Sequence, residues 1–182
     1  MPKGIRPTQD KVRKAIFDIL GDIEGLSFLE LYAGSGAVGF EALSRGVDEL
    51  VLVEYSRDCQ LAIQKNIEAL KAAACSLYPQ EGQKAILRLH KDKKKFDIVF
   101  LDPPYYQESS PRLRSRPMSA DNTASLAKKT LQTLGAYGIL APNGLVVVQH
   151  FKRDDLPQEC AGLTLIKASR YGDTVLSIYR NK

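Results

Sequence analysis

The sequence has few of the residues that build disulfide frameworks, zinc clusters or histidine-based catalytic sites. Its 182 residues include three cysteines and two histidines. Cys59, Cys75 and Cys160 lie far apart without a C-x-x-C pair, so neither a disulfide framework nor a zinc cluster is predicted. His90 and His150 each lack a Ser, Cys or second His at a useful spacing, so we expect packing or surface roles rather than general-base catalysis. No metal site is predicted.

Long apolar runs are also missing. No run approaches the roughly 18 residues needed to span a bilayer, and the polar segment Met1 to Asp10 lacks the apolar region of a secretory signal. We therefore expect a cytosolic protein that does not enter a membrane.

Hydrophobic residues make up 44% and charged residues 26% of the 182 residues, which is typical of a soluble globular protein. This length favours a single domain over residues 1–182, and we expect a monomer.

Basic residues outnumber acidic ones only modestly. The 26 Lys and Arg against 21 Asp and Glu give a formal net charge of +5, which favours polyanionic partners without identifying one. Three arginines, Arg112, Arg114 and Arg116, lie in a loop at 107–120 that is rich in Ser and Pro.

Short apolar runs alternate with segments of helical spacing along most of the chain. Strands are predicted at 28–33, 50–53, 76–79, 96–101, 145–149, 163–168 and 175–179, and helices at 8–20, 38–44, 57–74, 84–91 and 122–134. Strands that alternate with helices predict an α/β fold in which helices cover both faces of a parallel sheet. The last two strands are joined by only a few residues around Gly172-Asp173, so they should pair antiparallel at one end of the sheet.

A glycine-rich loop follows the first predicted strand and opens a helix. In Gly34-Ser35-Gly36-Ala37-Val38-Gly39, glycine allows the backbone to approach a nucleotide closely. This motif alone fits a nicotinamide-binding fold equally well. Glu30 lies four residues before the first glycine, in an otherwise apolar strand where an unpartnered carboxylate is costly. Loop amides, water or a cationic ligand group would remove that cost, and the ammonium and sulfonium groups of S-adenosylmethionine provide positive charge.

Two further acids follow the next two predicted strands. Glu54 lies 18 residues after Gly36 (54 − 36), where an acid can accept hydrogen bonds from both hydroxyls of a ribose. Glu81 follows the third strand and is a candidate acceptor for the adenine amino group, although the segment 79–82 is also typical of a turn.

The tetrapeptide Asp102-Pro103-Pro104-Tyr105 follows the fourth strand, beside the point where the strand order of such a sheet reverses. The two prolines fix the backbone and remove two amide donors, which leaves carbonyl groups and the Asp102 carboxylate to accept hydrogen bonds from an amine. Tyr105 can stack on a base that has been extruded from an RNA helix. The arrangement therefore predicts methyl transfer to the exocyclic amine of a nucleobase.

Five motifs in this order resemble the bacterial 16S rRNA guanine-N2 methyltransferases of the small ribosomal subunit. They are RPTQDKVR at 6–13, YAGSGA at 32–37, EALSRG at 41–46, FDIVFLDPPY at 96–105 and YGDT at 171–174. The resemblance implies a Rossmann-like class I methyltransferase with a seven-stranded, mostly parallel sheet and one antiparallel strand. It also implies S-adenosylmethionine as cofactor, guanine N2 as the methylated atom, and 16S rRNA or the assembling small ribosomal subunit as partner.

The motifs and the resemblance together assign candidate site residues. Segment 1–21 is expected to border the cleft. The expected catalytic residues are Asp102, Pro103, Pro104 and Tyr105. The expected cofactor-binding residues are Thr8, Glu30, Ala33, Gly34, Ser35, Gly36, Gly39, Glu54, Glu81 and Asp102. The expected substrate-binding residues are Arg6, Arg13, Arg45, Tyr105, Arg112, Arg114 and Arg116.

Other functions remain open at this point. The tetrapeptide Asp102-Pro103-Pro104-Tyr105, called the Asp102 corner below, would also suit a DNA adenine-N6 or a protein glutamine methyltransferase. The basic charge favours a nucleic acid over a protein. A nicotinamide-dependent oxidoreductase would share the glycine loop but would not need Glu30 or the Asp102 corner. A non-catalytic RNA-binding module would leave that corner without a purpose.

Overall fold

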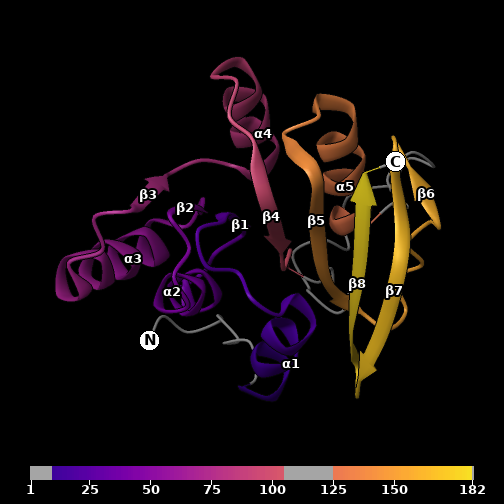
Figure 1. The fold of residues 1–182 in the computed structure, drawn as a ribbon, viewed down its shortest axis with the longest axis horizontal. Helices are drawn as coiled ribbons and strands as arrows, with labels where there is room; N and C mark the ends of the chain where they lie inside the picture. The colour runs from indigo at the N-terminus through magenta and orange to yellow at the C-terminus, as the bar shows by residue number, and fades with distance from the viewer. Residues whose placement is uncertain (1–9, 105–124, 182) are drawn as a thin grey trace, which may run out of the picture.

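The computed structural model of the protein describes residues 10–104 and 125–181. These residues form one sheet with helices on both faces (Figure 1). The helices are α1 Asp10–Leu20, α2 Ala37–Ser44, α3 Arg57–Leu70, α4 Gly82–Lys91 and α5 Leu126–Tyr137. The strands are β1 Ser27–Leu31, β2 Glu49–Val53, β3 Cys75–Tyr78, β4 Phe96–Leu101, β5 Leu140–Phe151, β6 Glu159–Cys160, β7 Leu163–Tyr171 and β8 Thr174–Asn181.

The sheet has the strand order β3-β2-β1-β4-β5-β8-β7-β6. The first five strands in this order are parallel, and β8 runs antiparallel to both of its neighbours. The α/β fold class, its mostly parallel sheet and the antiparallel closing pair are therefore confirmed. The predicted number of seven strands is wrong, because the described residues form eight. The missed strand, β6, is only Glu159–Cys160 and pairs antiparallel with β7, and two residues are too few for an alternating pattern.

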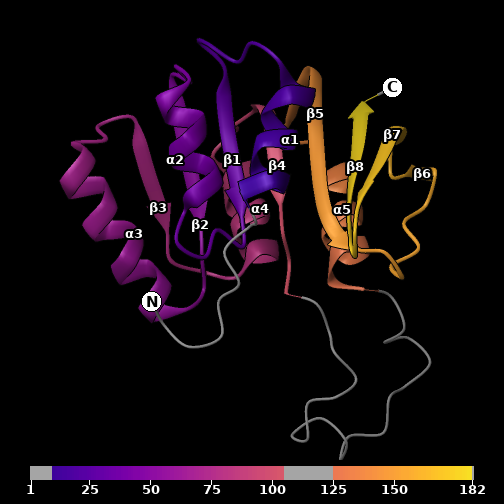
Figure 2. The same cartoon turned by 90° about the horizontal axis from the view of Figure 1, so that it is seen from below.

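Two apolar layers hold the helices onto the sheet, because alternate residues of each strand point to opposite faces. On β1, Leu29 and Leu31 pack with residues of α4 and α5, whereas Phe28 packs with residues of α1, α2 and α3. Figures 1 and 2 show these two groups of helices on opposite faces of the sheet. The central strands are thus buried on both sides, which explains their nearly continuous apolar sequences.

Several elements have bounds that differ from the predicted ones, and α3 and β5 show why. The predicted helix at 57–74 stops at Leu70, because Lys71 takes a left-handed conformation with φ of 49° and turns the chain toward β3. Strand β5 begins at Leu140, five residues before the predicted start at 145. The segment 141–144 resembles a turn, and Asn143 indeed has a positive φ of 63°, but Leu140 still pairs with Phe96.

The order of the central strands fixes where a ligand can bind. From β1 the chain crosses over to β2 and then to β3, which both lie on one side of β1. It then crosses back, so that β4 lies on the other side of β1. Ligands of open α/β sheets bind at the carboxyl ends of the strands at such a reversal. Among the described helices, none is long and apolar enough to cross a membrane.

Candidate active site

The carboxyl ends of β1, β2, β4 and β5 bring the main predicted site residues together. In the parallel register, Leu31 pairs with Val53 on one side and with Leu101 on the other, and Leu101 pairs with Val148. The residues that follow these positions, including Glu54, Asp102 and Gln149, therefore meet at one edge of the sheet. This edge is the candidate active site.

The glycine loop turns tightly between β1 and α2. Gly34 and Gly36 have positive φ values of 56° and 76°, a conformation that other residues rarely adopt. A Cβ on Gly36 would also lie 2.8 Å from a ring carbon of Phe40. The Ala33 amide donates to the Val53 carbonyl over 3.0 Å, and the Ser35 carbonyl accepts from Asn66 Nδ2 over 3.2 Å. These contacts fix the loop against β2 and α3.

Glu30 is buried beneath the start of α2, with only 3% of its surface exposed. Its Oε2 accepts a hydrogen bond from the Gly39 amide over 2.7 Å, so one of the unpaired N–H groups of the first helical turn gains a partner. Burial raises the pKa of Glu30 to about 8, although the Gly39 hydrogen bond opposes this shift; the Asp102 and Glu54 carboxylates add to it. The partner observed is thus a backbone amide in the first turn of α2, directly after the glycine loop. The shifted pKa also means that positive charge at this edge would stabilise the ionised form.

Glu54 accepts hydrogen bonds from two backbone amides, one in the glycine loop after β1 and one directly after β2. Its Oε2 accepts from the Gly34 amide over 2.8 Å, and its Oε1 accepts from the Ser56 amide over 2.7 Å. The carboxylate is partly buried and joins the glycine loop to the carboxyl end of β2. Because each carboxylate oxygen accepts more than one hydrogen bond, this position remains compatible with the predicted contact to a ribose.

Asp102 follows β4 directly and receives a hydrogen bond from β5. Gln149 Nε2 donates to Asp102 Oδ2 over 2.9 Å. Burial raises the pKa of Asp102 to about 7, while the Gln149 hydrogen bond lowers it. Pro103 is buried and Pro104 is exposed, so the backbone rises from the sheet toward solvent at this point. No hydrogen bond to the other oxygen, Oδ1, is formed by residues 10–104 or 125–181, which leaves it as an acceptor within this part of the chain.

The structure does not bring Glu81 into the buried part of this edge. Glu81 precedes the first residue of α4, is exposed, and forms an ion pair with Lys84 over 3.0 Å. Its neighbour Gln80 is the more buried polar residue, and the Gln80 Nε2 has no hydrogen-bond partner among the described residues. The predicted adenine contact of Glu81 stays a prediction.

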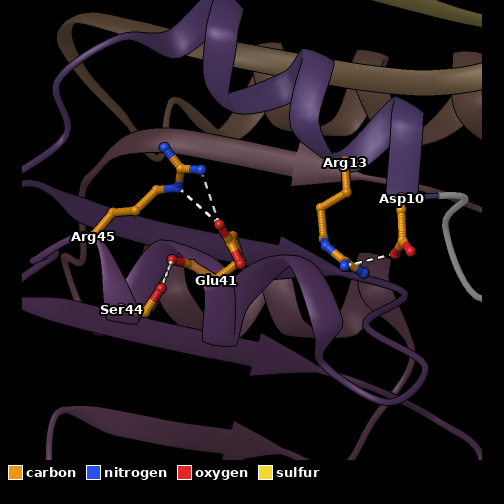
Figure 3. Close-up of polar contacts among 5 residues, drawn as sticks. All are labelled: Asp10, Arg13, Glu41, Ser44 and Arg45. Atoms are coloured by element: carbon orange, nitrogen blue, oxygen red, sulfur yellow. Dashed lines mark hydrogen bonds and ion pairs between the residues drawn. The ribbon is translucent and has the colours of Figure 1, made fainter.

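Arg45 follows the last residue of α2, at the far end of this helix from the glycine loop (Figure 3), and its predicted contact with the substrate stays a prediction. Because α2 begins at the carboxyl edge of the sheet and leads back toward the amino edge, its last turn points away from the site. The Arg45 guanidinium donates to Glu41 Oε1 over 3.0 and 2.9 Å and lies 4.4 Å from the Phe17 ring centroid. Its charge is thus used to fasten α2 to α1.

Arg13 lies on α1 near the carboxyl edge, where Figure 3 shows it turned toward Asp10. The two side chains form an ion pair over 2.7 Å. The other predicted site residues lie outside the described residues, and the structure places none of them: Arg6, Thr8, Tyr105, Arg112, Arg114 and Arg116.

A basic groove beside the site was not predicted from the sequence. It lies between α1 and β7, has a volume of about 450 Å³, and is lined by Lys11, Lys14, Lys167 and Tyr171, among other residues. Tyr171 ends β7 and pairs with Thr174, which in turn pairs with Phe151 at the end of β5. The groove therefore adjoins the same edge of the sheet. Lys11 and Lys14 lie on α1 whereas Lys167 lies on β7, so no local pattern could reveal that the three lysines line one groove.

No cluster of three or more potential metal ligands occurs within the described parts of the chain.

Comparisons with known proteins identify relatives of nearly the whole chain. The model of a family described as "Conserved hypothetical protein 95" matches residues 1–180. The chain is 30% identical over 186 residues to the "Ribosomal RNA small subunit methyltransferase D" of Haemophilus influenzae, with 98% of this chain and 84% of that protein covered.

Solved structures agree with this similarity. A "Putative methyltransferase" from Escherichia coli has a TM-score of 0.78 and 26% identity, with 100% of this chain and 91% of that one covered. An RNA methyltransferase from Salinibacter ruber, solved in complex with S-adenosyl-L-homocysteine, has a TM-score of 0.65 at 15% identity, with 97% and 94% covered. This last similarity shows the fold alone.

Proposed function

Since the chain belongs to the "Conserved hypothetical protein 95" family, the family of the small-subunit ribosomal RNA methyltransferases D, we propose that it methylates an exocyclic amine of ribosomal RNA. The methyl donor is S-adenosylmethionine. The substrate is 16S rRNA, free or in the assembling small subunit, and the acceptor is N2 of a guanine. Guanine 966 is the specific target that we propose.

The observation that carries this proposal is the Asp102 corner at the end of β4. Asp102 Oδ2 is held by Gln149, and the two prolines that follow have no amide hydrogen to donate. A group that binds here is surrounded by hydrogen-bond acceptors. The site therefore favours a group with N–H donors, such as an exocyclic amine. None of the three cysteines lies on β4 or β5 beside Asp102, since Cys59, Cys75 and Cys160 belong to α3, β3 and β6. Methylation of a ring carbon, which uses a covalent intermediate, is therefore not the chemistry we propose.

The chemistry at Asp102 is orientation and polarisation. The lone pair of a nucleobase amine is delocalised into the ring, so hydrogen bonds that fix both amine hydrogens turn the lone pair toward the methyl carbon. In the proposed complex, Asp102 Oδ1 accepts from one hydrogen and a backbone carbonyl of the proline pair accepts from the other. S-adenosylmethionine, when bound, supplies a methyl group activated by its sulfonium.

The proposed cofactor site uses the glycine loop and the two acids beside it. Glu54 would accept from the ribose hydroxyls, and Gly34 and Gly36 would allow close approach of the backbone. The buried carboxyl of Glu30, whose pKa is raised, fits a cationic ligand, because positive charge favours its ionised form. A nicotinamide dinucleotide fits poorly, since its pyrophosphate would need the helix start that Glu30 already occupies.

The groove between α1 and β7 is the proposed contact for RNA phosphates near the target base. Lys11, Lys14 and Lys167 provide positive charge, and the Tyr171 ring provides a surface on which a base can stack. This groove adds to the arginines predicted from the sequence, of which Arg45 is turned away from the site.

The test of the proposed function is direct. The protein is incubated with radiolabelled S-adenosylmethionine and with small-subunit particles or 16S rRNA that lack the modification, and the labelled nucleoside is identified after digestion. We expect N2-methylguanosine. Label on DNA adenine or on a protein glutamine instead would replace this function with one of the alternatives that share the Asp102 corner.

A further inference from the structure

Gln149 is the buried polar residue whose side chain contacts Asp102 from the neighbouring strand. It lies on β5 with 6% of its surface exposed, one position after the residue that pairs with Leu101. Parallel neighbours in register project to the same face of the sheet, and this brings its side chain beside Asp102. The amide Nε2 donates to Asp102 Oδ2 over 2.9 Å.

The oxygen of the Gln149 amide does not stabilise the described part of the protein through a hydrogen bond. Its Oε1 is buried and has no hydrogen-bond partner within the described residues. A buried acceptor without a partner costs stability, and an apolar side chain of similar size would avoid that cost. The contribution that only the amide makes at this position is therefore its N–H group directed at Asp102.

We propose that Gln149 is a positioning residue for methyl transfer, which holds Oδ2 of Asp102 so that Oδ1 faces the target amine as an ionised acceptor. This inference rests on the proposed function. A hydrogen bond donated to the carboxylate favours its charged form. It therefore opposes burial, which raises the pKa of Asp102 to about 7. A protonated Asp102 would offer a donor to the amine, so loss of the Gln149 N–H should remove the acceptor at neutral pH.

Among the described residues, no other ionisable group replaces this donor. Glu30 on β1 interacts with Asp102 as a like charge, and Glu54, directly after β2, is a further carboxylate. On β5, burial lowers the pKa of His150, whose Nε2 lies 2.8 Å from Ser177 Oγ on β8. On α1, Arg13 is paired with Asp10.

Two variants separate this role from a purely structural one. Gln149→Leu removes the amide and its orphaned oxygen, whereas Gln149→Glu keeps the size but replaces the donor with a second carboxylate. Ser177→Ala is the matched control, because it removes a buried polar group nearby that does not contact Asp102. The pKa of Asp102 is measured in each ligand-free protein by NMR of the labelled carboxyl carbon, and single-turnover methylation is measured between about pH 6 and about pH 9.

In Gln149→Leu we expect a higher pKa of Asp102 and a rate at neutral pH that is roughly tenfold or more lower, with recovery toward alkaline pH. In Gln149→Glu the two carboxyls should share a proton that is lost at higher pH than in the wild type. Ser177→Ala should keep both the pKa and the pH profile. An unchanged Asp102 pKa in both Gln149 variants, or a rate loss equal at all pH values, overturns the inference. A wild-type protein without activity overturns the proposed function instead, and the NMR titration still reports whether Gln149 controls Asp102.

Discussion

At the scale of single residues, Glu30 links the charge of the site to the stability of the fold. Its ordinary pKa of 4.5 applies to the unfolded chain, and its pKa in the folded protein is about 8. Between these values the folded state binds more protons than the unfolded state. The free energy of unfolding must therefore fall as pH rises through this window, by at most about 1.4 kcal/mol per pH unit.

The variant Glu30→Gln tests this linkage. Its amide oxygen can still accept from the Gly39 amide, but the side chain does not titrate. We expect the free energy of unfolding of the ligand-free variant to be less dependent on pH between about 4.5 and about 8 than that of the wild type. Urea denaturation at several pH values measures the difference, with Glu24→Gln on the exposed surface as a control. Identical pH dependence in wild type and Glu30→Gln would show that Glu30 is ionised in the folded protein.

The residues at the strand ends could be predicted from the sequence. A residue that directly follows an apolar strand lies at the carboxyl edge of a parallel sheet, whatever the rest of the fold. Glu30, Glu54 and Asp102 meet as predicted. What the sequence could not provide was the partner of each group. The contacts of Glu30 with the Gly39 amide and of Asp102 with the Gln149 amide depend on side-chain direction and on how strands and helices pack, which no local pattern encodes.

At the scale of elements, the start of α2 is packed more tightly than its sequence suggests. Gly39 lies inside this helix, where alanine would normally be favoured by about 1 kcal/mol. A Cβ on Gly39 would lie 2.5 Å from Leu52 Cδ2 and 2.7 Å from Glu30 Oε2. The glycine therefore permits close packing of α2 on β1 and β2.

We expect Gly39→Ala to destabilise the protein by about 1–3 kcal/mol despite its better helix propensity, because the added methyl must displace Leu52 or Glu30. Thermal unfolding at one pH measures this change. The comparison variant is Ser44→Ala in the last turn of α2, which tests helix propensity at a position outside the buried contact. A higher melting temperature for Gly39→Ala would contradict the packing.

Element boundaries were predicted where apolar periodicity was strong, as in β4, whose bounds Phe96–Leu101 agree with the prediction. The end of α3 was missed because the alanines at 72–74 have high helix propensity, whereas the observed turn at Lys71 is set by the need to begin β3. Strand β6 exists only through its pairing with β7.

At the scale of the whole molecule, the groove between α1 and β7 extends the proposed site toward an RNA backbone. Replacing Lys11, Lys14 and Lys167 by Gln should weaken RNA binding at low salt and make its salt dependence shallower, because each lost phosphate contact reduces the slope of log K against log salt by about 0.7–0.9. Filter binding over a salt series measures this slope. The control carries three Gln substitutions of equal charge at Lys65, Lys91 and Lys93, all of them exposed and outside the groove. Equal slopes in the two triple variants would remove the groove from the RNA contact.

The central claim is that the Asp102 corner acts on the amine and not on the cofactor. The most direct measurement compares wild type and Asp102→Ala in single-turnover methylation of small-subunit RNA, with S-adenosylmethionine affinity of both proteins determined by calorimetry. We predict that the rate falls by at least about a hundredfold while cofactor affinity stays nearly unchanged, because the lost interaction is made with the reacting amine. A nearly normal rate in Asp102→Ala, or a rate loss explained entirely by weaker cofactor binding, would contradict this account.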